Sequence, residues 1–347
     1  MNKKILIVGN LGYVGSVLSK HIKLKYKKDL LIGFDSGLFK KCFFGKKKKN
    51  NIYTDFQLFG DVRNFDYKIL HNIDHVIYLA AVSNDPMGNK FINPTLDINF
   101  KSAIKIAKRC KDNNVKTFTF ASSCSMYGFK NNLKNENSKL FPLTPYAQSK
   151  ILAENQLKKI SSKDFRIFSL RFGTACGVSP RFRLDLVLND FVTNAIVNKK
   201  IEILSRGDSW RPLIDVSDMC RAIEWSFVNK IKRNFIAVNV GHSKCNYQIK
   251  DLAFVVKKYL PKTKIYINSD NPPDKRSYKV NFNLYKKIAK GYLPIMKIND
   301  TVKETVKFVK KSQYSDKNFR NSDYVRLNYL KKMINKNKLN KNLFFKD

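Results

Sequence analysis

The sequence predicts an α/β protein: a doubly wound parallel sheet, completed by a smaller C-terminal domain. In the first half of the 347 residues, short apolar runs alternate with longer amphipathic ones, as in successive βαβ units. After about residue 175 this alternation becomes irregular, as expected for a smaller domain that completes a cleft. A chain of this length suits two domains, or one large α/β domain with an appendage.

Short apolar runs mark the expected strands of the sheet. They are residues 5–8, 30–35, 75–81, 117–121, 166–171 and 235–240. Helical patterns cover residues 13–25, 98–113 and 145–160. Right-handed crossovers between such elements give one sheet with helices on both faces. The last strand lies in a segment, residues 212–242, that we expect to return to this sheet from the second domain.

The charge of the chain is extreme, at +40, with 67 lysines and arginines against 27 acidic residues. Such a charge is compatible with nucleic-acid binding. The lysines, however, are spread over the whole length, which is typical of solvated surface residues. We therefore regard nucleic acid as an unlikely partner, although a basic field attracts any anionic substrate, including a diphosphate.

The cysteines and the amino terminus indicate the compartment. The six cysteines are widely spaced and form no CxxC or Cys/His cluster, which argues against a zinc site and against disulfides. The N-terminal apolar run is too short for a signal peptide, and no segment approaches a membrane span. We expect a cytoplasmic protein without a metal and without membrane contact.

A glycine turn, Gly9–Gly15 with the sequence GNLGYVG, follows the first strand and opens the first helix. Gly9, Gly12 and Gly15 let the backbone approach a pyrophosphate, while Tyr13 and Val14 open a helix whose N-terminus favours negative charge. With strand before and helix after, this turn predicts a Rossmann-like dinucleotide site.

Two acidic residues bear on which dinucleotide binds. Asp35 ends the second strand, where a carboxylate accepts hydrogen bonds from the adenosine ribose and repels a 2′-phosphate, so NAD is favoured over NADP. Lys40 and Lys41 nearby leave room for NADP. Asp61, with Val62, either contacts the adenine amine or is an ordinary turn aspartate, and the sequence leaves both possibilities open.

Tyr146 and Lys150 lie one turn apart on one face of the helix expected over residues 145–160. An ammonium there lowers the cost of forming a phenolate, so the tyrosine becomes a usable base. Tyr146 is the only tyrosine with lysine at the fourth position after it. Ser123, just past the strand at 117–121, is expected at the same carboxyl edge of the sheet.

With these motifs the chain resembles the extended short-chain dehydrogenase/reductase family, the NAD-dependent nucleotide-sugar epimerases and dehydratases, over about residues 3–300. The resemblance rests on the glycine turn, Leu79–Ala81, the turn Ser123–Gly128, Tyr146 with Lys150, and Arg211–Val216. It implies a Rossmann-like NAD-binding domain over residues 1–175, a mainly substrate-binding domain over 176–311, and a basic tail over 312–347 that we expect to be partly disordered.

The resemblance also implies a role for each matching residue. Tyr146 is the expected base, Lys150 its partner and a ligand of the nicotinamide ribose, and Ser123 a hydrogen-bond partner of the reacting hydroxyl. Expected NAD-binding residues are Gly9, Gly12, Tyr13, Val14, Gly15, Asp35, Asp61, Val62, Leu79, Ala80, Ala81, Tyr146 and Lys150. Expected substrate-binding residues are Ser83, Ser123, Thr174, Arg211 and Arg276, whose two arginines would grip a diphosphate by their forked geometry. Arg181 and Arg183 are equally compatible with surface ion pairs.

Departures from the family pattern bear on the reaction. The 4,6-dehydratases carry an Asp-Glu pair directly after the serine or threonine, where this chain has Cys124 and Ser125. The asparagine that often follows the strand ending at Arg171 is replaced near Thr174. The sequence therefore favours an epimerase, which oxidises a ring hydroxyl of a nucleotide sugar to a keto intermediate and reduces it again.

Other functions stay open. A keto-sugar reductase or a dehydratase would use the same hydride site, and a non-catalytic dinucleotide- or RNA-binding protein would use the fold and the charge. The resemblance further implies a homodimer formed through the helices near residues 98–113 and 145–160, and a place in surface-polysaccharide or deoxysugar synthesis.

Overall fold

A computed structural model describes residues 2–45, 52–129, 132–268, 270–271 and 276–346. The lysine run at 46–49, which the sequence predicts to be an exposed loop, lies outside these ranges.

The main sheet has seven parallel strands in the order β11-β7-β5-β4-β1-β2-β3. The strands are β1 (Lys4–Val8), β2 (Leu30–Asp35), β3 (Phe56–Phe59), β4 (His75–Tyr78), β5 (Thr117–Ser123), β7 (Arg166–Phe172) and β11 (Phe235–Val240). The strand order reverses beside β1, and this switch point is where ligands bind in such sheets. The α/β fold class predicted from the sequence is confirmed.

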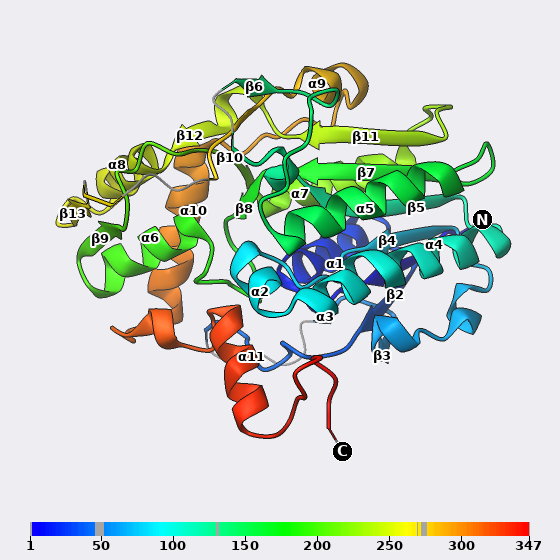
Figure 1. The fold of residues 1–347 in the computed structure, drawn as a ribbon, viewed down its shortest axis with the longest axis horizontal. Helices are drawn as coiled ribbons and strands as arrows, with labels where there is room; N and C mark the ends of the chain where they lie inside the picture. The colour runs from blue at the N-terminus through cyan, green and yellow to red at the C-terminus, as the bar shows by residue number, and fades with distance from the viewer. Residues whose placement is uncertain (1, 46–51, 130–131, 269, 272–275, 347) are drawn as a thin grey trace.

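Helices cover both faces of this sheet (Figure 1). On one face, α1 (Tyr13–Lys25) and α7 (Val216–Val228) bury apolar residues against the strands. On the other face lie α4 (Ala103–Asp112), preceded by a π-helical turn at Asp97–Ser102, and α5 (Pro145–Ile160). Short helices α2 (Asp85–Lys90) and α3 (Ile92–Leu96) connect β4 to this layer.

A smaller part of the chain packs beside the carboxyl ends of the strands (Figure 1). Its strands are β8 (Thr174–Cys176), β9 (Lys200–Ile203), β10 (Trp210–Asp215), β12 (Asn246–Gln248) and β13 (Lys264–Ile267). Its helices are α6 (Val187–Val197), α8 (Ile249–Tyr259) and α10 (Ile298–Ser312). The strand pair β6 (Leu133–Lys134) and β14 (Lys279–Val280) and the helix α9 (Asn283–Ile288) lie near β11.

The local sequence explains why α5 begins where it does. Pro145 is at the start of the helix, where its missing N–H costs nothing, and the Thr144 hydroxyl accepts from the Ala147 N–H at 3.2 Å. The expected strand over residues 75–81 instead ends at Tyr78. The chain leaves the sheet at Leu79–Ala81 and turns into the cavity described below.

The segment after α10 was expected to be partly disordered, whereas in the structure it contains the helix α11 (Arg326–Asn335). Leu330, Leu339 and Leu343 are buried in it. Among the described residues, no helix is long and apolar enough to cross a membrane.

Candidate active site

A cavity of about 750 Å³ lies at the carboxyl ends of the parallel strands, between the main sheet and the smaller part of the chain. All the residues predicted to bind cofactor or substrate line it. They are Gly9, Gly12, Tyr13, Val14, Gly15, Asp35, Asp61, Val62, Leu79, Ala80, Ala81, Ser83, Ser123, Tyr146, Lys150, Thr174, Arg211 and Arg276.

The glycine turn fits a closely approaching ligand. Gly9 has a φ of +95°, and a Cβ there would lie 2.6 Å from the backbone nitrogen of Ala80. A Cβ on Gly15 would lie 2.3 Å from the Gly9 carbonyl oxygen. Gly12, by contrast, has only that same oxygen within reach, at 3.4 Å, and borders the cavity. Gly9 and Gly15 thus let the turn close on itself, and Gly12 leaves room for a pyrophosphate at the start of α1.

Asp35 is held at the end of β2 by two backbone donors. Its carboxylate accepts from the Leu11 N–H at 3.0 Å and from the Gly37 N–H at 2.8 Å. Burial raises the pKa of this carboxyl group, while these two hydrogen bonds lower it. Since a carboxylate has about four acceptor positions, it retains capacity for ribose hydroxyls.

Asp61 serves as an N-cap. Its carboxylate accepts from the backbone N–H of Arg63 at 2.8 Å and from the Arg63 Nε at 2.8 Å. It therefore does have the turn role that the sequence allowed, and it also lines the cavity beside Val62.

Ser123, Tyr146 and Lys150 converge in the cavity. The Ser123 side chain lies close enough to the Tyr146 phenol to stabilise its charged form. The Lys150 Nζ donates to the Ala121 carbonyl oxygen at 2.7 Å and lies 5.6 Å from the centre of the Tyr146 ring. β5 supplies the serine and α5 the other two, so the sheet edge and one helix face bring them together.

Burial sets the protonation of this group. Desolvation raises the pKa of Tyr146 to about 12, although the nearby Ser123 side chain opposes the rise. Desolvation also lowers the pKa of Lys150 to about 7, and the nearby Glu154 carboxylate opposes that fall. In the ligand-free protein the phenol is therefore neutral near pH 7, and a positive charge brought close to it would favour the phenolate.

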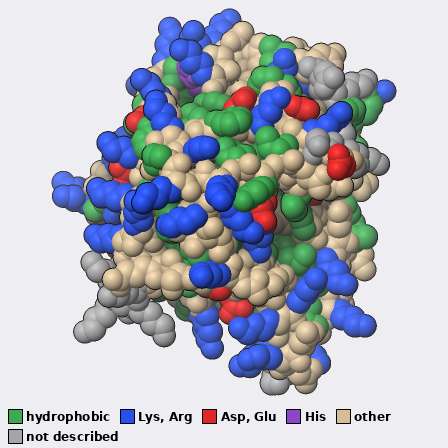
Figure 2. All heavy atoms as spheres, turned by 90° about the vertical axis from the view of Figure 1, so that its left-hand side faces the viewer, with side chains coloured by type: hydrophobic (Ala, Val, Ile, Leu, Met, Phe, Trp, Pro, Cys, Tyr) green, Lys and Arg blue, Asp and Glu red, His purple; other side chains and the backbone are tan. Residues whose placement is uncertain are grey.

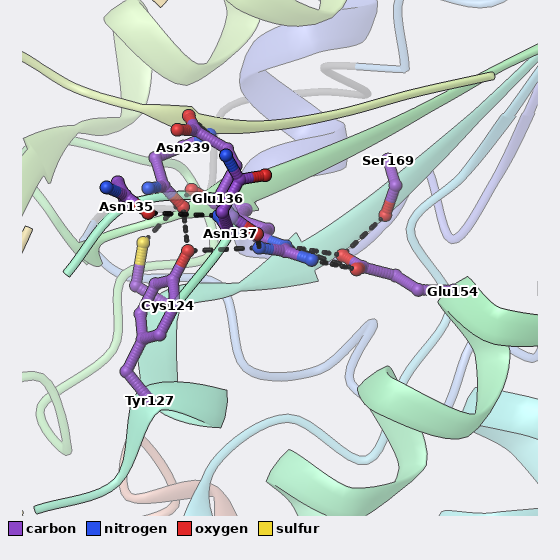
Figure 3. A network of polar contacts seen from close by, with 9 residues as sticks. Cys124, Tyr127, Asn135, Glu136, Asn137, Glu154, Ser169 and Asn239 are labelled. Carbon is purple, nitrogen blue, oxygen red and sulfur yellow. Dashed lines mark hydrogen bonds and ion pairs between the residues drawn. The ribbon is translucent and has the colours of Figure 1, made fainter. Parts of the chain in front are cut away.

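A network of polar contacts connects α5 with Tyr127, which lies in the turn after β5 (Figure 3). Arg171 on β7 pairs with Glu154 on α5, with its Nη2 2.7 Å from Oε2. The Arg171 Nη1 also donates to the Tyr127 hydroxyl at 3.0 Å, and that hydroxyl donates to the Asn239 side-chain oxygen at 2.7 Å. Tyr127, which the sequence suggests as a packing residue, is thus also hydrogen-bonded.

The two positions that dehydratases fill with acids carry no acid here. Cys124 is fully buried, burial raises the pKa of its thiol, and its sulfur contacts the Arg171 carbonyl oxygen at 3.2 Å. Ser125 accepts from the Ser123 hydroxyl at 2.9 Å. Neither side chain can therefore serve as the general acid or the general base of a water elimination.

Arg211 and Arg276 border the part of the cavity in the smaller domain. Arg211 is 7% exposed, and its guanidinium lies 5.7 Å from the Tyr278 ring centre. Arg276 pairs with Asp85 at 2.8 Å. Thr174 lies on β8, and Ser83 accepts from Arg183 at 2.9 Å, so Arg183 is a buried structural residue that fixes a loop of the site.

Several cavity residues were not predicted. Asp85 accepts from Thr144, which caps α5, at 2.6 Å, and so connects Arg276 with the start of α5. Asp190 and Arg320 form a bidentate pair with two contacts of 2.9 Å. Their only signal in the sequence is charge, which is common in this chain.

Comparison with known proteins agrees with this geometry. The model of the NAD dependent epimerase/dehydratase family matches residues 5–241. The uncharacterized UDP-glucose epimerase YtcB of Bacillus subtilis is 29% identical over 233 residues, which cover 63% of this chain and 71% of that protein.

Solved structures share the fold. A UDP-N-acetylglucosamine 4-epimerase from Methanobrevibacter ruminantium superposes with a TM-score of 0.77 at 23% identity, over 90% of this chain and 99% of that one. A UDP-glucuronic acid 4-epimerase from Bacillus cereus superposes with a TM-score of 0.75 at 23% identity, over 90% of this chain and 100% of that one. Because the family model covers well over half of the sequence, the chain belongs to the NAD dependent epimerase/dehydratase family.

Proposed function

We propose that this NAD-dependent enzyme epimerises a nucleotide-diphosphate sugar, with Tyr146 as the base that moves the proton of a ring hydroxyl. One observation carries the proposal: Ser123, Tyr146 and Lys150 face a cavity that is also lined by the two arginines Arg211 and Arg276. UDP-hexoses are the first substrates to test, because the relatives described above are named for UDP-sugars.

The residues divide the chemical work among them. When bound, NAD supplies a reversible hydride acceptor. Tyr146 takes the hydroxyl proton as the carbon is oxidised and returns it when the ketone is reduced. Ser123 holds the reacting oxygen beside the phenol, and Lys150 favours the phenolate by its charge. Rotation of the keto-sugar between the two hydride transfers inverts the carbon.

The substrate end suits a diphosphate. The Arg211 guanidinium is almost fully buried at the cavity wall, and Arg276 also lines the cavity. Guanidinium groups bind phosphate oxygens in a bidentate manner. In this proposal the Asp85 partner of Arg276 restrains that side chain until the diphosphate binds.

A dehydratase is the second candidate, since the family includes dehydratases. Against it stand Cys124 and Ser125, which occupy the positions of the elimination acid and base. Asp85 is a carboxylate in the same cavity, but it is engaged by Arg276 and Thr144.

Incubation with UDP-glucose, UDP-N-acetylglucosamine and UDP-glucuronic acid, with NAD added, tests the proposal. Epimerisation gives a product of unchanged mass with new ring-proton couplings in the NMR spectrum. Loss of one water in the mass spectrum would show a dehydratase, and net production of NADH would show a dehydrogenase.

We also propose a homodimer formed through the outer faces of α4 and α5. The exposed residues on these helices include Lys105, Lys108, Lys158 and Lys159. A two-fold contact sets such a face against itself, so we expect dimerisation to strengthen with salt. Sedimentation velocity at low and high salt tests this, and a monomer under both conditions excludes it.

We place the enzyme in the cytoplasm. All six cysteines are free thiols, as in a reducing compartment. Fractionation of cells that produce the tagged protein tests this location.

A further inference from the structure

The C-terminal segment lies against the part of the cavity where the adenosine half of NAD is expected. The cavity-lining residues of this segment are Val325, Arg326, Leu327, Leu330 and Leu343. They share the cavity wall with Asp35, Asp61 and Val62. In Figure 1 the segment (red) runs along the side of the molecule that carries α2 and β3.

An apolar cluster fastens this segment to two loops that frame the cofactor site. Leu330, Leu339 and Leu343 are buried in it. Leu38 and Phe39, from the loop after Asp35, and Val82, Met87 and Phe91, from the chain after Ala81, complete the cluster. Because these leucines are removed from water, they hold the segment against the chain that frames the cavity.

Arg63 makes a second, polar connection. It follows Val62 directly, and its guanidinium donates to the carbonyl oxygens of Asn342 at 2.5 Å and Leu343 at 3.1 Å. The same guanidinium lies 3.3 Å from the centre of the Phe344 ring. Any movement of the segment away from the cavity must break these contacts.

Arg326, the first residue of α11, contributes a buried positive charge. It is 3% exposed, lies 4.8 Å from the Phe39 ring centre, and donates through Nη2 to the Arg181 carbonyl oxygen at 3.0 Å. Its Nη1 has no hydrogen-bond partner within the described part of the chain. The charges of Arg181, Arg183 and Asp185 are also close, and Arg183 pairs with Asp185 at 2.8 Å. With Arg183 paired in this way, the charges of Arg326 and Arg181 favour a nearby anion.

We propose that residues 326–344 form part of the cofactor site, where they enclose the adenosine half of NAD and slow its release. Leu330 and Leu343 supply an apolar wall for the adenine, and Arg326 supplies charge that the diphosphate of NAD balances. The cofactor then stays bound through successive turnovers, as an epimerase requires, because it ends each cycle in its starting redox state.

The comparison with solved structures is compatible with an addition of this kind. The Methanobrevibacter epimerase is covered over 99% of its length but covers only 90% of this chain. About a tenth of this chain therefore has no counterpart there.

A chain that ends at Lys336 tests the apolar wall, because it retains α11 and lacks Leu339, Leu343 and Phe344. We expect its dissociation constant for NAD to rise by about tenfold or more, with faster release of NAD in stopped-flow displacement. Leu343→Ala, in the full-length chain, is expected to shift the constant in the same direction by a smaller factor. Lys331→Met, an exposed residue on α11, is the matched control and should leave NAD binding unchanged.

Arg326→Met tests the charge while leaving the segment in place. The affinities for NAD and for ADP should fall by similar factors, since both ligands carry the diphosphate. UDP binding, measured by calorimetry, reports on the opposite end of the cavity and should match the unaltered protein. If the unaltered protein binds NAD but epimerises no nucleotide sugar, the proposed function fails and the present inference, which is measured by NAD binding, stands. NAD affinities within about twofold of the original in all three variants would overturn the inference.

Discussion

Arg171 and Glu154 form a buried bidentate ion pair one helical turn beyond Lys150. The Arg171 Nε lies 3.1 Å from each carboxylate oxygen, and the two side chains are 8% and 5% exposed. The Ser169 hydroxyl donates to the same carboxylate at 2.8 Å. Because Tyr146, Lys150 and Glu154 lie four residues apart on one face of α5, the ion pair fixes the helix at the depth and rotation that the first two need.

Replacing one member of this pair should destabilise the fold. Arg171→Met leaves the Glu154 carboxylate buried without its cation, so we expect the free energy of unfolding to fall by about 3–5 kcal/mol. The double variant Arg171→Met/Glu154→Leu removes both charges and should recover much of the loss. Urea denaturation measures both. A double variant less stable than either single variant would show that the pair itself, and not the unpaired charge, dominates.

Tyr146→Phe should remove the proton-transferring group and leave NAD binding intact. The phenyl ring keeps the packing, but no oxygen remains to take the hydroxyl proton, and we expect turnover to fall by about a hundredfold to ten-thousandfold. NMR detection of the epimerised sugar gives the rate, and calorimetry gives the dissociation constant for NAD.

The matched control is Tyr266→Phe on β13, where the side chain is half exposed. This control should change neither the turnover rate nor the dissociation constant for NAD. Retained turnover in Tyr146→Phe would contradict the assignment of the base.

Parts of this site could be predicted from the sequence because their signals are local. Thr144, Pro145 and the apolar spacing define α5 over Pro145–Ile160 as observed, and the glycine turn is contiguous. The pair of Arg276 with Asp85 could not be predicted. Its members are 191 positions apart. Because the chain has 67 lysines and arginines, the sequence does not show which of them pairs with a given acidic residue.

The C-terminal segment shows a second limit. Its many lysines and asparagines are typical of disordered tails, but Leu330 on α11 and Leu339 and Leu343 beyond it are buried against the chain around the cofactor site. The overall composition of the segment does not reveal the effect of these few leucines. Only the tertiary structure shows that Leu38 and Phe39 form an apolar surface on which the leucines pack.

Lys150→Met should stabilise the ligand-free protein in a pH-dependent manner. Burial lowers the pKa of Lys150 from 10.5 to about 7 in the folded state, so between these values the unfolded chain binds more protons. The stability of the unaltered protein therefore rises with pH through this window, and below it the cost of burying the charge is present in full. The melting temperature of the variant should exceed that of the unaltered protein most at about pH 6, and the gap should narrow towards about pH 10.

Lys158→Met, an exposed position on the same helix, is the control and should give no pH-dependent gap. A gap for Lys150→Met that is independent of pH would show that the residue is not desolvated in solution.

Gly12→Ala and Gly15→Ala form a matched pair that separates cofactor binding from folding. A Cβ on Gly12 meets only the Gly9 oxygen at 3.4 Å, so the fold should tolerate it, but the methyl group enters the space expected for the pyrophosphate. A Cβ on Gly15 would lie 2.3 Å from that oxygen and 2.6 Å from the Asn10 Cα, so the turn itself must move. We expect Gly12→Ala to keep the melting temperature of the ligand-free protein while NAD affinity falls by about tenfold, and Gly15→Ala to lower both. Thermal unfolding with and without NAD measures both the stability of the ligand-free protein and the stabilisation by NAD. If NAD raised the melting temperature of Gly12→Ala as much as that of the unaltered protein, the pyrophosphate would have to lie elsewhere in the cavity.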